Sequence, residues 1–426
     1  MVQGYSNLAV TRFRLDIAIG IAKLAGGLSR QLGRGSGVAV SGRVLTFLFP
    51  QALMHLGQSV ECILISATNG KTTTTAMCSK VIGQKNGVIS NSLGNNMFGG
   101  IAETLSRARS SDVAVLEVDE AHLPLVVSAT SPKAVVLMNL SRDQLDRVSE
   151  VRSIAERWER ALRERNDTVV IANVSDPLVY FAVRNCPNLI KVELGSKWSS
   201  DSGACPACAA PLSFGSDGSY HCQSCDFAMP ECDYRLGDKT LVHKDMADLE
   251  ISCGLPGQFN IQNAAMATVV GLYYDVTPPD IGLALSEMQS VAGRFDEVEI
   301  FGKRVLVLMA KNPAGWQAML EMLKEDTRAV VLSINANVAD GHDTSWLYDV
   351  DFSQLSRREV IATGKRRFDL ATRLFYDGVD YSCVDDDLRA IENCKSDDVV
   401  FVGNYSAFQS FSRRIRSLRT RDRVQT

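Results

Sequence analysis

The segment Thr68-Asn69-Gly70-Lys71-Thr72-Thr73 carries the residue types in this sequence that most clearly point to chemistry. It follows an apolar stretch typical of a buried strand and precedes helical periodicity, so its backbone N–H groups would face outward at a helix N-terminus. In such a loop the glycine lets the backbone approach a phosphate, the lysine reaches the terminal phosphates, and the next threonine hydroxyl can ligate Mg²⁺. The complete Walker A pattern has a glycine where this chain has Ile65, and a bare Gly-Lys-Thr also occurs in plain turns. The position between a strand and a helix favours nucleotide binding.

Two further polar clusters follow the next strand-like stretches. Glu117 lies next to the end of the run Asp112–Val118, and the polar segment Asn139–Arg147 begins at the end of the run Lys133–Asn139. In an open α/β sheet, ligands bind outside the carboxyl ends of the parallel strands. We therefore expect Glu117 to ligate Mg²⁺ beside Lys71, although Glu117 alone would be interpreted as an ordinary exposed strand end.

Two Cys-x-x-Cys pairs, thirteen residues apart, form the third signal: Cys205 with Cys208, and Cys222 with Cys225. Four thiolates at this spacing suit tetrahedral Zn²⁺, and they leave no open position for catalysis. The sequence therefore predicts a structural zinc ribbon. The chain has eleven cysteines, an odd number in a long chain of cytosolic character, which excludes a simple disulfide framework. We interpret the other seven as ordinary thiols.

The elements that must position these groups are strands alternating with amphipathic helices. This alternation is typical of a parallel sheet covered by helices, and thus of an α/β fold. A helical period over Val151–Arg165 lies between two of the strands, and another begins near Gln262. Between them, residues 196–235 are rich in Ser, Gly, Asp, Pro and Cys. The expected strands are Cys62–Ala67, Asp112–Val118, Lys133–Asn139 and Thr168–Asn173.

A second α/β series begins near Val298, with strands expected at Arg304–Met309, Ala329–Ile334 and Val399–Gly403. We place the boundary between the two series at residues 293–297. The expected organisation is an N-terminal helix and linker over 1–50 and a central domain over 51–295, with the cysteine insertion at about 198–235. A Rossmann-like α/β domain would follow over 296–426.

Composition and charge narrow the class of partner. The 426 residues carry a net charge of −4, which argues against a nucleic-acid binder that relies on bulk charge. The segment Leu15–Leu28 is interrupted by Asp16 and Lys23 and is too short to span a bilayer. We expect an amphipathic helix packed on the body of a cytoplasmic protein. Peripheral contact with the inner face of the membrane, by this helix or by the six arginines of Arg413–Arg423, is the weaker interpretation.

Taken in order, the motifs resemble those of the Mur ligase superfamily. The resemblance implies an ATP-dependent ligase with ATP and Mg²⁺ bound at the Lys71 loop, Thr72 and Glu117. It also implies that Asn263 lies near the adenine and that Arg294 meets the phosphates. The matching segments are Thr68–Thr73, Glu117, Asn139–Arg147, Asn173–Pro177, Leu255–Ala264, Gly293–Phe295 and Lys311–Pro313.

Departures from the usual pattern point to one branch of that superfamily. About fifty residues precede the ATPase core, too few for a UDP-sugar-binding domain. Gln144 occupies the position of the superfamily's usual metal-binding histidine, which puts a second Mg²⁺ site in doubt. Ala67 replaces a glycine of the phosphate loop, and Lys311 replaces another histidine. With the cysteine insertion, these features resemble the MurT branch, the ATPase subunit of lipid II isoglutaminyl synthase, which works with a GatD glutaminase.

The C-terminal half is also similar to that branch. Its acidic segment Asp340–Phe352 resembles the stretch from which an aspartate completes the glutaminase's Cys–His pair across the interface. We assign this role to Asp349, with Asp343 and Asp351 as rivals, because an acid there would orient the imidazole and stabilise its cation. An acidic loop of this kind is commonly just solvated or caps a helix.

The resemblance implies ATP-dependent amidation of the D-glutamate α-carboxylate in the lipid II stem peptide. An acyl phosphate would be attacked by ammonia from a partner glutaminase, since Cys62 and Cys78 lie in apolar contexts unsuited to a glutaminase nucleophile. One alternative is a stand-alone amino-acid ligase of the folylpolyglutamate or murein-tripeptide type, whose ATP turnover would depend on an amino acid. Another is a zinc-ribbon scaffold with a regulatory ATP site, which would tolerate loss of Lys71.

Overall fold

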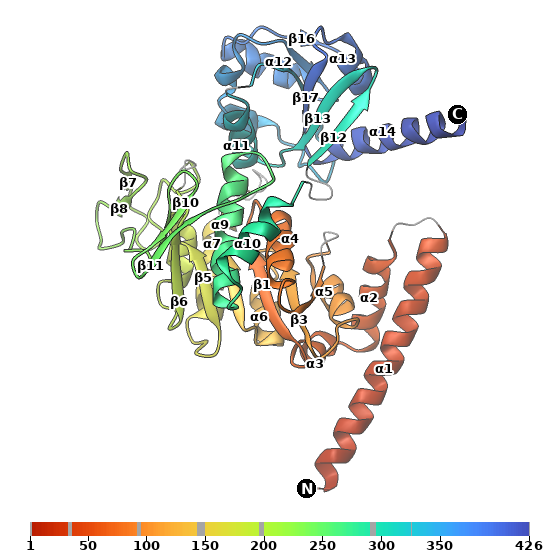
Figure 1. Cartoon of the computed structure of the whole chain (residues 1–426), viewed down its shortest axis with the longest axis vertical. Helices are drawn as coiled ribbons and strands as arrows, with labels where there is room; N and C mark the ends of the chain where they lie inside the picture. The colour runs from red at the N-terminus through yellow and green to blue at the C-terminus, as the bar shows by residue number, and fades with distance from the viewer. Residues whose placement is uncertain are drawn as a thin grey trace.

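The computed structural model describes residues 2–32, 36–91, 95–142, 150–195, 200–289, 295–324 and 326–425. Two α/β bodies, each built on its own sheet, lie one above the other, and a helical hairpin projects beside the lower body (Figure 1). The predicted α/β class with parallel sheets is confirmed.

In the described residues, the larger sheet has nine strands in the order β11-β10-β9-β6-β5-β4-β1-β3-β2. Its strands from β6 to β2 run parallel, while β10 pairs antiparallel with both β9 and β11. The four strands predicted here are confirmed as β1, β3, β4 and β5, with ends that differ by at most two residues. The bounds are β1 Glu61–Ser66, β2 Gly87–Ser90, β3 Asp112–Glu117, β4 Ala134–Leu137, β5 Val169–Asn173, β6 Leu189–Glu193, β9 Tyr234–Leu236, β10 Thr240–His243 and β11 Met246–Glu250.

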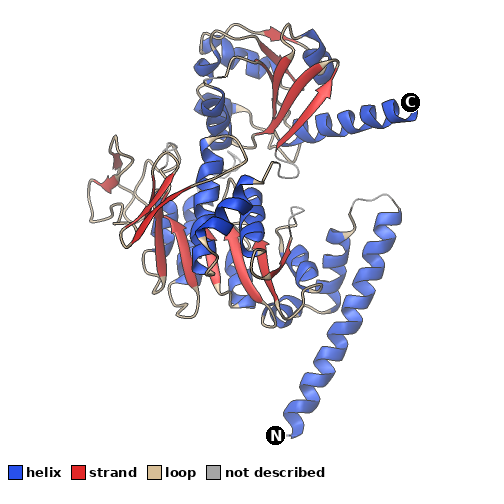
Figure 2. Ribbon diagram, in the orientation of Figure 1, coloured by secondary structure: helices blue, strands red, loops and turns tan. Residues whose placement is uncertain are grey.

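Helices cover both faces of this sheet (Figure 2). Because alternate residues of a strand point to opposite faces, Cys62 and Leu64 of β1 join one buried cluster, and Ile63 and Ile65 join the other. Helices α5–α8 contribute to the first cluster, and α4, α9 and α10 to the second. The bounds are α4 Lys71–Ile82, α5 Phe98–Leu105, α6 Leu123–Thr130, α7 Glu150–Leu162, α8 Pro177–Val183, α9 Gln258–Tyr273 and α10 Pro278–Ser286.

The N-terminal segment is helical, as predicted: α1 (Val2–Gln31) packs antiparallel on α2 (Val38–Leu48), and α3 (Ala52–Gly57) leads into β1. Gly42 of α2 lies against α5 so closely that an added Cβ would sit 2.2 Å from the Gly99 carbonyl oxygen. None of the described helices combines the length and apolarity needed to cross a bilayer.

The cysteine insertion leaves the sheet after β6 and returns to it at β9, which pairs with β6. It contains the antiparallel hairpin β7 (Leu212–Phe214) and β8 (Tyr220–Cys222). The rings of Tyr220 and Phe227 stack at 5.8 Å, Phe227 contacts two aromatic rings of α8, and the Tyr220 hydroxyl donates to the Val174 carbonyl at 2.9 Å. The insertion is therefore anchored on α8 and the end of β5.

The upper body has a described sheet of six strands in the order β12-β13-β17-β14-β15-β16, parallel except for the edge strand β12. The three predicted strands are confirmed as β13, β14 and β17. Of the predicted boundary, residues 293–297, the first two lie outside the described residues and the other three form the start of β12. The bounds are β12 Phe295–Ile300, β13 Lys303–Met309, β14 Ala329–Ser333, β15 Val360–Thr363, β16 Ser382–Cys383, β17 Asp398–Gly403, α11 Pro313–Leu323, α12 Arg367–Tyr376, α13 Asp387–Asn393, α14 Tyr405–Gln425, and the 3-10 turns η2 Ser345–Asp349 and η3 Phe352–Leu355.

Candidate active site

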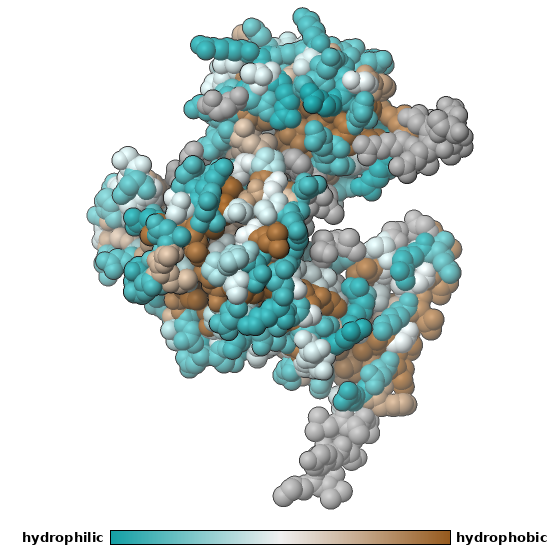
Figure 3. Space-filling model, viewed as in Figure 1, coloured by the Kyte–Doolittle hydropathy of each residue, from teal (hydrophilic) through white to brown (hydrophobic). Residues whose placement is uncertain are grey.

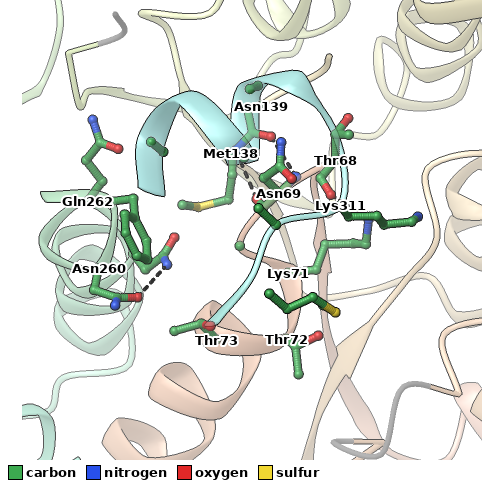
Figure 4. Close-up of a pocket in the computed structure, with 18 of the residues that line it drawn as sticks. Thr68, Asn69, Lys71, Thr72, Thr73, Met138, Asn139, Asn260, Gln262 and Lys311 are labelled. Atoms are coloured by element: carbon green, nitrogen blue, oxygen red, sulfur yellow. Dashed lines mark hydrogen bonds between the residues drawn. The ribbon is translucent and has the colours of Figure 1, made fainter. Parts of the chain in front are cut away.

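The loop between β1 and α4 is shaped by Gly70, which adopts φ 86° and ψ −8°. An L side chain disfavours this left-handed conformation, and an added Cβ would lie 2.7 Å from Oδ1 of Asn263. The glycine therefore lets the loop turn directly into the first residue of α4, Lys71, whose side chain faces the cavity shown in Figure 4.

We expect Gly70→Ala to destabilise the protein by about 1–3 kcal/mol, from backbone strain and crowding of Asn263, and to weaken nucleotide binding by about tenfold or more. Thermal unfolding and nucleotide titration measure the two effects. Gly302→Ala is the matched control, because Gly302 has φ 72° but open space around it in the β12–β13 turn. Equal nucleotide affinity in wild type and Gly70→Ala would contradict the role of this turn.

The segment after β4 holds the loop in place. Asn139 accepts a hydrogen bond from the Asn69 N–H through Oδ1 at 2.9 Å and donates to the Asn69 carbonyl through Nδ2 at 3.0 Å. The Thr68 hydroxyl donates to the Ser141 carbonyl at 3.1 Å and accepts from the Ser141 N–H at 3.0 Å. Asp176 accepts from the Leu140 N–H at 2.8 Å and caps α8. These bonds fix the loop against the ends of β4 and β5.

Lys71 is paired with a carboxylate inside the site. Its Nζ lies 2.8 Å from Glu120 Oε2, and the two side chains are only 11% and 12% exposed. The ammonium also donates to the carbonyls of Ala67 and Thr68. An incoming phosphate would meet a cation already held at the mouth of the loop, with Glu120 as its competitor.

Glu117 is buried, and one of its carboxylate oxygens has no hydrogen-bond partner among the described residues. Its side chain accepts from Asn96 Nδ2 through Oε1 at 3.0 Å, while Oε2 is buried and has no hydrogen-bond partner among the described residues. Asn91 brackets the same residue, bonding its backbone N–H and carbonyl at 2.8 Å each. A buried carboxylate oxygen without a partner is costly, and a divalent cation supplies what it lacks. The donor set therefore fits Mg²⁺.

Asn91 and Asn96 were not singled out from the sequence. The signal that would have found them is the same one that found Glu117, since polar residues also follow the carboxyl end of β2. Strand β2 is short and only half-buried, so its end was not recognised.

A cavity of about 240 Å³ brings these groups together with the upper body. The loop residues 68–73, Glu117, Asn139 and Asn263 line it from below, and Met309 and Lys311 from above. Figure 4 shows Lys71 and Lys311 on the same side of this cavity. A second, larger cavity of about 1100 Å³ shares Asn69 and Asn139 with it, which leaves room for a large substrate next to the phosphate loop.

Of the predicted residues Asn263, Arg294 and Gln144, only Asn263 lies among the described residues. Asn263 lines the cavity, but its amide is engaged with Thr74 (3.2 Å) and Asn260 (3.3 Å), so it supports the loop from beneath. Its contact with adenine stays a prediction. Arg294 and Gln144 lie outside the described residues.

The four predicted zinc ligands converge. The Sγ atoms of Cys205, Cys208, Cys222 and Cys225 all lie within 4.8 Å of one another. The separations Cys205–Cys225 and Cys208–Cys222 are 3.8 and 3.4 Å. Ligands at a Zn–S distance of about 2.3 Å stand ~3.8 Å apart in a tetrahedron, so the cluster fits one Zn²⁺. Cys232 is not part of the group and contacts Glu193 instead.

Cys62 and Cys78 are almost completely buried, as expected for thiols without a catalytic role. Burial raises the pKa of Cys62 to about 12 and raises that of Cys78 further above its ordinary range. Neither thiol is suited to act as a nucleophile near neutral pH.

The three candidate aspartates of the acidic segment differ in their contacts. Asp343 accepts from the Ser345 N–H at 2.8 Å and Asp351 from the Ser353 N–H at 3.0 Å, so both act as local caps. Asp349 instead reaches the lower body, where its Oδ2 accepts from Arg142 Nη2 at 3.1 Å. This contact was not predicted, because the two residues are 207 positions apart.

Arg142 is shared between two carboxylates. Besides Asp349, it pairs with Asp201 at the start of the cysteine insertion, whose side chain is 3% exposed. Arg142 follows Ser141, the residue that holds Thr68. One guanidinium thus connects the upper body, the insertion and the segment beneath the phosphate loop.

Comparisons with known proteins agree with this geometry. The profile of the Mur ligase middle domain matches residues 65–271, and that of the MurT ligase C-terminal domain matches residues 309–408. A pseudomurein peptide ligase type C from Methanothermus fervidus superposes with a TM-score of 0.63 at 17% identity, covering 84% of this chain and 79% of that one. MurF from Acinetobacter baumannii superposes with a TM-score of 0.60 at 15% identity, covering 86% and 77%. The fold is that of the Mur ligases, which are ATP-dependent.

Two curated relatives narrow the family. The MurT subunit of the glutamine-hydrolysing lipid II isoglutaminyl synthase of Streptococcus pneumoniae is 30% identical over 419 residues, covering 90% of this chain and 93% of the relative. The MurT subunit of Staphylococcus aureus is 30% identical over 384 residues, covering 84% and 86%. The chain belongs to the MurT family.

Proposed function

We propose that this chain is the ATP-dependent subunit of a lipid II isoglutaminyl synthase, which amidates the α-carboxylate of D-glutamate in the stem peptide to give D-isoglutamine. The observation that carries the proposal is the buried, half-satisfied Glu117 carboxylate in the same cavity as the Lys71 loop. Membership of the MurT family supplies the reaction class. Use of ATP assigns the reaction to the cytoplasm.

The chemistry follows from the poor leaving group of a carboxylate. Transfer of the γ-phosphoryl group to the carboxylate gives an acyl phosphate and ADP. Ammonia then attacks the acyl carbon, and phosphate leaves as the amide forms and a proton is lost from nitrogen. Lys71 would offset charge on the transferring phosphoryl group, and the Asn139 clamp would keep the loop N–H groups aimed at it. Mg²⁺ held by Thr72 and Glu117 would neutralise phosphate charge, and Arg294 would add a further cation.

We assign the ammonia supply to a GatD-like glutaminase that docks near Asp349. Tyr348, Phe375 and Tyr376 are 57%, 71% and 70% exposed, and their rings form one cluster beside Asp349. Exposed aromatic side chains of this kind are frequent at protein–protein interfaces. Asp349 would orient the partner's imidazole from the edge of this cluster.

We expect Asp349→Asn to lower glutamine hydrolysis by the assembled complex by about 10³-fold or more, because an amide cannot stabilise the imidazolium. Amidation with added ammonium salt should be retained, since an asparagine oxygen can still accept the Arg142 hydrogen bond and the Arg142–Asp201 pair is unchanged. Asp343→Asn and Asp351→Asn are the matched controls and should change hydrolysis little, as both side chains only cap local turns. Loss of hydrolysis in a control, with retention in Asp349→Asn, would move the role to the rival.

The proposed function is tested by assaying the purified chain, with and without a co-purified glutaminase, for ATP-dependent amidation of lipid II. We expect ammonia-dependent amidation by the chain alone and glutamine-dependent amidation only with the partner. Glutamine hydrolysis by the chain alone would contradict a separate glutaminase. ATP turnover that depends on an amino acid, with no response to ammonia, would favour the stand-alone ligase.

The zinc site is proposed to be structural.

A further inference from the structure

Helix α1 has two apolar faces, of which the body of the protein covers one. Leu15, Ala18 and Ala22 are 8%, 4% and 2% exposed and join the core beneath α2. A second row of large apolar side chains is 46–71% exposed and lies along one side of the helix and its C-terminal turn. We call it the outer stripe: Phe13, Ile17, Ile21, Leu24, Leu28 and Leu32.

The outer stripe has the regularity of a contact surface. Its residues are spaced by four, four, three, four and four positions, which keeps them on one side of an α-helix. Figure 3 shows brown side chains along the outer edge of α1, away from the body. Scattered exposed apolar residues are normal, but a contiguous row of this length marks an interaction site.

Charge distinguishes between the surfaces that such a stripe could meet. The exposed charged side chains of α1 are Arg12, Arg14, Lys23 and Arg30 against Asp16 alone, whereas the whole chain carries a net charge of −4. None of the four cations pairs with a carboxylate of a described side chain. Arg12, Lys23 and Arg30 fall within about 20° of one another around the helix axis, on the polar side.

We propose that the outer stripe seats α1 on an anionic lipid bilayer, with the helix lying in the interface. An apolar stripe combined with a polar face rich in Arg and Lys is the composition of interfacial helices. A second copy of the chain would bring the same excess of cations and offer nothing to neutralise it. The membrane that holds the enzyme would then present a lipid-linked substrate to the cavity. This last step rests on the proposed function.

The test uses co-sedimentation of the full chain with vesicles, in the absence of substrate, nucleotide and partner. The probes are vesicles of phosphatidylcholine alone and vesicles of equal parts phosphatidylcholine and phosphatidylglycerol. We expect binding to the mixed vesicles that is at least about tenfold stronger than to phosphatidylcholine and weakens with salt. The double variant Ile17→Glu/Leu24→Glu should bind the mixed vesicles at least about tenfold more weakly than wild type.

The matched control is Leu125→Glu/Leu283→Glu, which adds the same charge at side chains 60% and 56% exposed on α6 and α10. It should bind vesicles within about twofold of wild type. Both double variants replace exposed side chains, so thermal unfolding should be near that of wild type in each. Because binding is measured without the reaction, failure of the amidation assay leaves this result intact, and the reverse also holds.

Three outcomes overturn the proposal. The first is that wild type does not bind the mixed vesicles. The second is that the stripe variant binds them as well as wild type does. In the third, sedimentation velocity without lipid shows a concentration-dependent dimer that Ile17→Glu/Leu24→Glu abolishes, which would make a second copy the partner of the stripe.

Discussion

Replacing Lys71 with alanine is expected to lower kcat/KM for ATP-dependent amidation by about 10³-fold or more. The ammonium lies at the start of α4 inside the cavity, and the Lys71 side chain is only 11% exposed. Bulk solvent therefore cannot take over the stabilisation that this positive charge provides. Without it, the phosphoryl group would face Glu120 and Glu117 with less compensating charge. The readout is the rate with saturating ammonium salt, which removes the glutaminase from the measurement.

Lys80→Ala is the control for this variant. Lys80 lies on the same helix, but its side chain is 33% exposed and pairs with Glu287, which is 58% exposed. Such a surface pair contributes little, so activity should stay within about twofold. Glu120→Gln keeps the Lys71 ammonium and removes the negative charge that competes with the phosphate for it. This variant separates the effect of the Glu120 charge from the effect of Lys71. An amidation rate in Lys71→Ala equal to that of wild type would favour a regulatory nucleotide site.

The central strands and the phosphate loop could be predicted because their signals are local. Strands β1 and β3–β5 are continuous apolar runs, and the residues that follow them fall at one edge of the sheet. Strands β9–β11 were missed because they lack such runs: β11 is almost entirely exposed, and only isolated residues such as Leu236 and Leu241 are buried. Short, largely exposed strands at this end of the sheet leave no hydrophobic pattern.

The contacts that complete the site depend on tertiary structure. The pairing of Lys71 with Glu120 and the orphaned oxygen of Glu117 depend on how the ends of β1, β2 and β3 meet. The bond between Arg142 and Asp349 joins two bodies whose relation no local pattern encodes. The prediction of an N-terminal helix packed on the body is confirmed, but periodicity did not separate the buried face of α1 from the outer stripe.

Arg142 gives the cysteine insertion a connection to the site. Asp201, at the start of the insertion, is nearly inaccessible to solvent and pairs with Arg142. The same guanidinium contacts Asp349, and the adjacent Ser141 holds the phosphate loop. A change in the insertion should therefore reach both the ATP site and the proposed glutaminase contact, although none of its cysteines lines the described cavity.

Chelation of the Zn²⁺ that we propose for the cysteine cluster is expected to unfold the insertion and to lower the thermal stability of the chain. Structural zinc sites bind with apparent free energies of about 10 kcal/mol or more at neutral pH, and that energy is folding energy. The hairpin β7–β8 has only two short strands and few buried side chains of its own, chiefly Leu212 and Tyr220. Metal analysis of the purified chain should give about one zinc per chain.

Cys208→Ser should reduce the zinc content to near zero, lower the unfolding midpoint, and lower amidation through loss of the Asp201 contact with Arg142. Cys232→Ser is the matched control, since Cys232 lies in the same insertion but outside the four-thiol group. It should retain zinc and stability. A four-thiolate site has no open position, so activity lost by Cys208→Ser should follow the unfolding of the insertion. Full zinc content in Cys208→Ser would place the metal outside this four-thiol group, and full stability after chelation would show that the cluster is not held together by a metal.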